Sequence, residues 1–195
     1  EEINTFTREL TSTTQPVDIK QQPAIAATRE AYKRCGKDPS RYRPSAEALR
    51  RRLMRGLELY QIDTLVDLIN LVSLRTGYSI GGFDADKIQG DSLELGIGRA
   101  EEPFEGIGRG TLNIEGLPVY RDRAGGIGTP TSDNERTKMG LETRRILAIV
   151  NGYNGREGLA EAAGMIQELL RKYADSDGET ILYLSLIHIS GAHET

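Results

Sequence analysis

TLVDLINLVSLRT, the stretch from Thr64 to Thr76, carries leucine, isoleucine or valine around most of its girth when it is wound as a helix. A helix that is apolar on nearly every side has to be buried inside a protein. Gly77 follows directly, and glycine commonly ends a helix because it accepts a left-handed backbone. The sequence therefore predicts a buried central helix over residues 64–76, around which the rest of the domain packs.

Helical patterns also precede this segment. Residues 2–10 and 21–35 are predicted to form two helices, the second of which ends at a glycine. The next residues, 36–44, read GKDPSRYRP and are typical of a loop. A third helix is expected to start at Ser45, which we predict to be its N-cap, and to end at Gly56.

The residues after the central helix have a different character, because glycines recur every few positions and the apolar runs are short. Alternating or short apolar runs predict strands over residues 92–97, 111–114, 118–122 and 146–150. Residues 155–174 have the spacing of an amphipathic helix. With no internal repeat and no low-complexity linker, the chain is predicted to be one α+β (α/β) domain.

The end of the chain reads as foreign sequence. LSLIHIS, at residues 184–190, matches residue for residue a translation of the transposon end used as a sequencing-library adapter. We therefore interpret 184–195 as an adapter translation and 1–183 as a single domain truncated at both ends. An ordinary edge strand is the alternative interpretation, because residues 181–189 are rich in β-forming residues.

The composition excludes several kinds of site. Both histidines, His188 and His193, lie in the suspected adapter segment, so the remaining sequence offers no imidazole for nucleophilic catalysis. Cys35 is the only cysteine, which excludes an internal disulfide and leaves no zinc ligand set. The glycine pairs lack the spacing of dinucleotide and nucleoside triphosphate loops. We therefore expect no cofactor and no metal.

Charge and hydropathy bear on the location and partners of the protein. No run approaches the ~18 apolar residues of a membrane span, and a lone cysteine fits a reducing compartment, so we expect a cytoplasmic protein. The net charge of −4 argues against non-specific coating of nucleic acid. It leaves room for a local basic face.

Four motifs occur in order along the chain. They are PSAEALRRRL at 44–53, DTLVDLINLVSL at 63–74, GYSIGGFDADKIQG at 77–90 and DRAGGIGTPTSDNERTKMGLET at 122–143. Their order and spacing resemble the B3/B4 domain, the tRNA-editing domain of the phenylalanyl-tRNA synthetase beta subunit, of which free-standing copies occur. The resemblance covers roughly residues 24–183 and includes no other part of that subunit. It implies a central β-sheet flanked by helices, with a cleft between sheet and loops.

The resemblance also implies a function. In the synthetases this domain hydrolyses the ester of a wrongly attached amino acid, so the chain is expected to bind the acceptor end of an aminoacyl-tRNA and to deacylate mischarged tRNA in trans. Without histidine, the proton acceptor is expected to be the terminal hydroxyl of the tRNA or a carboxylate, and no catalytic residue is assigned. Backbone amides of the glycine loops are candidates for holding the oxyanion. The alternatives are a non-catalytic module that binds an amino acid or the tRNA end, and a detached fragment of a synthetase beta chain.

The resemblance implies a set of substrate-binding residues. Those that match its motifs are Asn70, Gly81, Gly82, Phe83, Asp84, Gly126, Ile127 and Gly128. Asn70 is expected to be buried beside the sheet, and the bare glycines are expected to let the backbone approach a ligand. The chain departs from the family pattern at Gly81, where the synthetases usually carry histidine, and at Ile149, where they carry an acidic residue. Both departures bear on specificity and on catalysis.

Two polar groups are candidates for contact with tRNA. Ser132, Arg136 and Thr137, together with Asp133, form the most polar local cluster, which either serves the tRNA end or is a solvated loop. On the predicted helix after Ser45, the arginine run that we expect to contact tRNA phosphates consists of Arg50, Arg51 and Arg55, helped by Lys37, Arg41 and Arg43. A solvated helix face is the alternative interpretation of that run.

Overall fold

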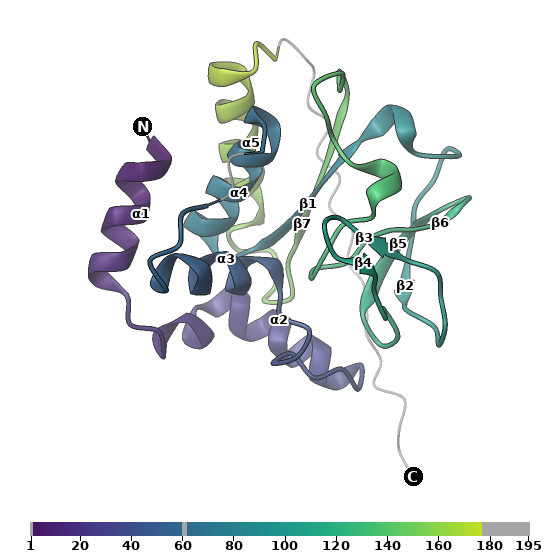
Figure 1. The fold of residues 1–195 in the computed structure, drawn as a ribbon, viewed down its shortest axis with the longest axis horizontal. Coiled ribbons are helices and arrows are strands. Elements are labelled where there is room, and N and C mark those ends of the chain that lie inside the picture. Colours follow the sequence, from purple (N-terminus) through teal and green to yellow (C-terminus); the bar gives the residue numbers. More distant parts are fainter. Residues whose placement is uncertain (1, 60–61, 177–195) are drawn as a thin grey trace.

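The structure, a computed structural model, describes residues 2–59 and 62–176 (Figure 1). The helices in these residues are α1 (Glu2–Thr13), α2 (Pro23–Arg34), α3 (Ser45–Met54), α4 (Thr64–Thr76) and α5 (Leu159–Tyr173), with short 3-10 turns η1 (Asp18–Gln21), η2 (Ala85–Lys87) and η3 (Glu135–Thr137). The strands are β1 (Ser79–Asp84), β2 (Glu94–Ile97), β3 (Glu105–Gly106), β4 (Gly110–Thr111), β5 (Pro118–Asp122), β6 (Gly125–Gly128) and β7 (Ile146–Asn151). The adapter prediction for residues 184–195, with both histidines, lies outside the described residues.

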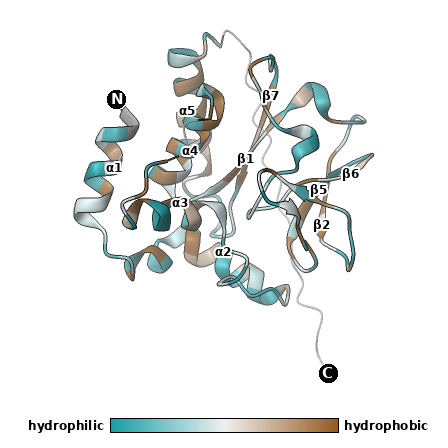
Figure 2. Cartoon of the chain, in the orientation of Figure 1, coloured by the Kyte–Doolittle hydropathy of each residue, from teal (hydrophilic) through white to brown (hydrophobic). Residues whose placement is uncertain are grey.

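The prediction of a buried central helix is confirmed by α4. The Asp63 side chain caps its first turn by accepting a hydrogen bond from the Val66 N–H at 3.0 Å. Gly77 ends it with a φ of 78°, a left-handed conformation that favours glycine. Helix α5 packs beside α4, and together with β1 and β7 they form the largest apolar cluster of the protein's described part. Figure 2 shows the hydrophobic residues gathered on these elements.

Strand β1 lies at the centre of the molecule, between the helices and the remaining strands (Figure 1). All its residues are buried, and it pairs antiparallel with β7, so that Gly81 lies opposite Ile149. Its other edge meets the loop after β6 through a bridge between Phe83 and Lys138. Strand β1 therefore connects the helical half to the loop that carries the polar cluster.

The other strands form two further antiparallel sheets, one with the order β2-β5-β6 and one made of β3 and β4. A second core cluster supports them, in which Tyr32 of α2 packs with Phe104, Ile114, Leu117 and Val119. The α+β class is confirmed, with the strands distributed over three small sheets. No helix among residues 2–59 and 62–176 combines the length and the apolar character needed to cross a bilayer.

Two local predictions are wrong. The residue before α3, Pro44, occupies the N-cap position, and the Ser45 N–H donates to the Pro130 carbonyl at 2.8 Å. The chain around residues 111–114 is a strand only at Thr111, because Ile114 turns into the second core, where it is fully buried. In both places a contact with a distant segment replaces the expected local one.

Candidate functional site

Gly81 of β1 and Gly128 of β6 face each other across the ring of Phe83. A Cβ added at Gly81 would lie 2.7 Å from the Phe83 Cζ atom, and one added at Gly128 would lie 2.5 Å from the same atom. The ring itself is 1% exposed. Three of the predicted site residues therefore come together where β1 meets β6. The Phe83 ring fills the volume above the two glycines, so this volume is not open to a ligand.

Asp133 lies at the same junction. Its Oδ1 atom is 3.1 Å from the position of a Gly81 Cβ and 3.0 Å from that of a Gly128 Cβ. Its Oδ2 atom accepts a hydrogen bond from the Gly82 N–H at 3.1 Å, and its backbone forms a bridge with Gly128. We call the group formed by Gly81, Phe83, Gly128 and Asp133 the junction site.

The environment of Asp133 makes its carboxylate costly to ionise. Burial raises the pKa of Asp133 to about 7, because the Gly82 N–H, which favours the charged form, offsets only part of the loss of water. A carboxyl group with a pKa near neutrality accepts and releases protons at physiological pH. Sequence reasoning placed Asp133 in a polar cluster without an ionisable role, because burial by β1, about fifty residues earlier, is not visible in the local pattern.

Asp84 and Asp122 are buried carboxylates of another kind, since several donors surround each of them. Burial alone would raise the pKa of Asp84, but hydrogen bonds from the Thr143 hydroxyl at 2.9 Å and from the Asp86 N–H at 3.0 Å lower it below its ordinary value. Asp122 likewise has a lowered pKa, because its hydrogen bonds outweigh burial; Arg136 reaches both of its oxygens, at 2.9 and 2.8 Å. Asp84 and Arg136, both predicted substrate contacts, therefore have structural partners.

The remaining predicted substrate residues are dispersed around the junction site. A Cβ on Gly82 would meet Ile69 and Met139, on the opposite face of β1, and one on Gly126 would meet Phe104 and Val119. Of the other predicted residues, Ile127 and Thr137 are fully buried. The Thr137 hydroxyl has no hydrogen-bond partner in the part of the chain that the structure describes. Ser132 is half-buried, and so is Asn70 on α4, contrary to its predicted burial.

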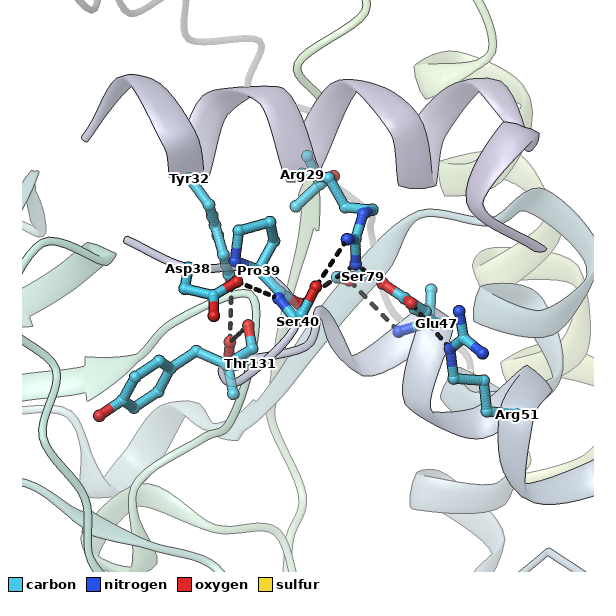
Figure 3. Close-up of polar contacts among 12 residues, drawn as sticks. Arg29, Tyr32, Asp38, Pro39, Ser40, Glu47, Arg51, Ser79 and Thr131 are labelled. Carbon is cyan, nitrogen blue, oxygen red and sulfur yellow. Dashed lines mark hydrogen bonds and ion pairs between the residues drawn. The ribbon is translucent and has the colours of Figure 1, made fainter. Parts of the chain in front are cut away.

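Hydroxyl groups fasten the loop that carries Asp133. The Thr131 hydroxyl, 2.8 Å from that of Tyr32, donates to the Tyr42 carbonyl at 3.2 Å (Figure 3). On the other side of β1, the Tyr120 hydroxyl donates to the Asn151 Oδ1 atom at 2.9 Å. The first contacts join α2 to the segment that leads to Asp133, and the last joins β5 to β7. The sequence has no periodicity that predicts them.

The predicted tRNA-binding arginines do not form one exposed face. Arg50 is 8% exposed, and its Nη2 atom donates to the Leu74 carbonyl near the C-terminus of α4 at 2.6 Å, so its assignment to an exposed phosphate-binding face is wrong. Arg51 pairs with the fully buried Glu47 at 2.8 Å, as Figure 3 shows. Arg55 is exposed at the end of α3. A cation near the last carbonyls of a helix is favourable, which explains the position of Arg50.

Gly128→Ala is expected to destabilise the protein by about 1–3 kcal/mol, because the new methyl group would overlap the buried Phe83 ring. Gly164→Ala is the matched control. A Cβ at Gly164 of α5 meets nothing within 4 Å, and alanine is expected to stabilise a helix interior by up to ~1 kcal/mol. Urea unfolding of both variants measures the difference. Equal free energies of unfolding for the two would contradict the close packing at the junction site.

A group of three or more metal-binding side chains is absent from residues 2–59 and 62–176. A comparison with curated proteins finds no match. The sequence does match the family described as the B3/4 domain, over residues 27–171 of the 195-residue chain. This domain is found in phenylalanyl-tRNA synthetase beta chains. Since the match covers well over half of the sequence, this chain belongs to the B3/4 domain family.

Proposed function

We propose that the protein hydrolyses the ester of a mischarged aminoacyl-tRNA, with Asp133 as the proton acceptor. The observation that carries the proposal is the position of the half-buried Asp133, whose carboxyl group lies beside the backbones of Gly81 and Gly128 and accepts a hydrogen bond from the Gly82 N–H. Ester hydrolysis needs a base that is ionised near neutral pH and still basic enough to take a proton from water. A carboxyl group with a pKa of about 7 meets both conditions.

The proposed reaction has two steps. The carboxylate of Asp133 takes one proton from a water molecule while the water oxygen attacks the ester carbonyl, which gives a tetrahedral oxyanion. The carbon–oxygen bond to the terminal ribose then breaks, and the ribose oxygen receives the proton from Asp133. The products are a free amino acid and an uncharged tRNA. Main-chain N–H groups of the glycine segments would stabilise the oxyanion.

Binding without hydrolysis is the second candidate function. It is favoured by the position of the Phe83 ring, which fills the space above Gly81 and Gly128. The apolar Ile149 opposite Gly81 adds no group that could take part in proton transfer. A protein of this kind would hold an amino acid or the tRNA end in the same region.

The purified protein, mixed with a panel of mischarged tRNAs, is expected to release at least one amino acid faster than buffer does. The release of labelled amino acid is followed over time, and the binding of the same tRNAs is measured by fluorescence anisotropy. Hydrolysis of one member of the panel supports the deacylase. Binding without release across the whole panel would instead establish the non-catalytic module, and absence of both would contradict both candidates.

A further inference from the structure

We infer that the loop of residues 37–43, and not helix α3, contacts the phosphates of the tRNA 3′ end; this inference rests on the proposed function. The loop reads KDPSRYR, with three cations and one acidic residue. Arg41 and Arg43 are exposed. Neither has an ion-pair partner among residues 2–59 and 62–176. Arg41 lies over the Tyr42 ring, 5.7 Å from its guanidinium carbon to the ring centroid. Within the described part of the chain no carboxylate neutralises either guanidinium group, whereas Arg50 and Arg51 have structural partners.

The charges next to these arginines leave the loop positive. Lys37 is buried and donates to the main-chain carbonyls of Asn113 and Glu115, which carry no charge. Burial lowers the pKa of Lys37, while the nearby Glu115 carboxylate partly restores it and Arg41 lowers it further. The acidic residue of the loop, Asp38, accepts a hydrogen bond from the Ser40 N–H at 2.8 Å. The three cations of the loop therefore outnumber the two acidic side chains named here, Asp38 and Glu115.

The loop is fastened directly to the segment that carries Asp133. The Tyr42 carbonyl, between the two exposed arginines, accepts a hydrogen bond from Thr131, two residues before Asp133. The Tyr42 ring lies under the Lys37 ammonium group, 3.8 Å from the nitrogen to the ring centroid. Arg29 holds the start of the loop through the Pro39 carbonyl at 3.2 Å (Figure 3). The loop is consequently held in one position relative to the junction site.

This position suits the chemistry of the proposed substrate. The 3′ end of a tRNA is a single strand whose phosphodiesters lie close to the ester, so cations must lie close to the proton acceptor. Arginine binds phosphate through two parallel hydrogen bonds, and helix α3 starts two residues after Arg43, so its N-terminal dipole adds positive potential there. Arg55 follows the last residue of the ten-residue α3, about 15 Å further along the helix.

The double charge reversal Arg41→Glu/Arg43→Glu tests the surface, with Arg55→Glu as the matched control at the other end of α3. Each protein is assayed on an aminoacyl-tRNA and on the same amino acid esterified to adenosine, which has no phosphate. The double variant is expected to raise the KM for the tRNA by on the order of tenfold or more at low salt, and to lower the slope of log affinity against log salt by about 1.4. Hydrolysis of the adenosine ester is expected to stay within about twofold, since that substrate offers no phosphate.

Three results would overturn the inference. The first is a double variant that matches Arg55→Glu on the tRNA, and the second is a larger effect of Arg55→Glu. The third is an equal impairment on both substrates, which would indicate a structural role for the loop. If the unaltered protein hydrolyses neither substrate, the proposed function fails. The phosphate-binding role of the loop is then tested by tRNA binding alone. Uncharged tRNA should then bind the double variant on the order of tenfold more weakly at low salt, and a tRNA without its single-stranded 3′ end should not show this difference.

Discussion

Asp133→Asn is expected to stabilise the protein at about pH 8 while it greatly slows ester hydrolysis. Asp133 has a pKa of about 7 in the folded protein and 3.8 as its ordinary value. The folded state therefore binds the proton more tightly than the unfolded chain, and the stability that this provides is complete below pH 3.8 and is lost as the pH rises towards about 7. The difference between the two pKa values corresponds to on the order of 4 kcal/mol.

Asparagine retains an oxygen that accepts from the Gly82 N–H, and it carries no charge at any pH. The variant should therefore lack the fall in stability between about pH 4 and 7, and it should exceed the unaltered protein by an amount on the order of that loss. Urea unfolding at several pH values measures this. Asp84→Asn is the control with the opposite sign, because a lowered pKa stabilises the folded state above the ordinary value. Parallel curves for the unaltered protein and Asp133→Asn would contradict the raised pKa.

The catalytic half of the same prediction separates a base from a merely structural carboxyl group. The hydrolysis rate of the unaltered protein, corrected for buffer, should fall about tenfold per pH unit below pH ~7, because protonated Asp133 cannot accept a proton. The Asp133→Asn variant should be slower by about 10²- to 10⁴-fold and should lose this pH dependence. A variant that is stable, as expected, and still hydrolyses the ester at the full rate would exclude Asp133 as the acceptor.

Glu47→Ala is expected to have the other large effect, a loss of about 3–5 kcal/mol in the free energy of unfolding. Glu47 is 0% exposed and receives Arg29 and Arg51, each at 2.8 Å. These two side chains are only 12% and 21% exposed, so the substitution leaves two poorly hydrated cations without their anion. Arg29 also holds the loop of residues 37–43, so its displacement should loosen the proposed phosphate-binding surface as well.

The control for this prediction is Glu30→Ala, which removes an exposed pair with Lys33 that is 3.4 Å long. Both of its side chains are more than half exposed, and exposed pairs of this kind contribute about 0–1 kcal/mol. Urea unfolding compares the two alanine variants with the unaltered protein. If Glu47→Ala lowers the free energy of unfolding no more than Glu30→Ala does, the ion pairs of Glu47 with Arg29 and Arg51 do not hold α2 to α3.

The sequence was sufficient where one segment determines its own structure. Helix α4 and its end at Gly77 follow from apolar spacing and from one glycine, and β5 has the predicted bounds for the same reason. The burial of Arg50 could not be predicted in this way. Its place on α3 was predicted, but its burial depends on the Leu74 carbonyl, which comes from another helix. Its exposure therefore depends on how two helices pack, which periodicity within one helix does not determine.

The candidate site could be predicted only in part, for a related reason. Gly81, Phe83 and Gly128 were chosen from motifs, and they do lie together, because β1 and β6 meet at that point. What fills the space between them is a tertiary property, and here it is a ring from the same motif. Asp133 was visible as a polar residue, but its raised pKa arises from burial at a junction between segments that are distant in sequence.

The contact between the Phe83 ring and the two glycines has a consequence for how this region can change over time. Positions 81, 83 and 128 share one volume, so that a side chain gained at either glycine has room only if the ring shrinks or departs. Substitutions that are harmful one at a time should then be tolerated as sets. Related sequences are therefore expected to differ here by joint changes, in which a larger side chain at position 81 or 128 accompanies a smaller one at position 83.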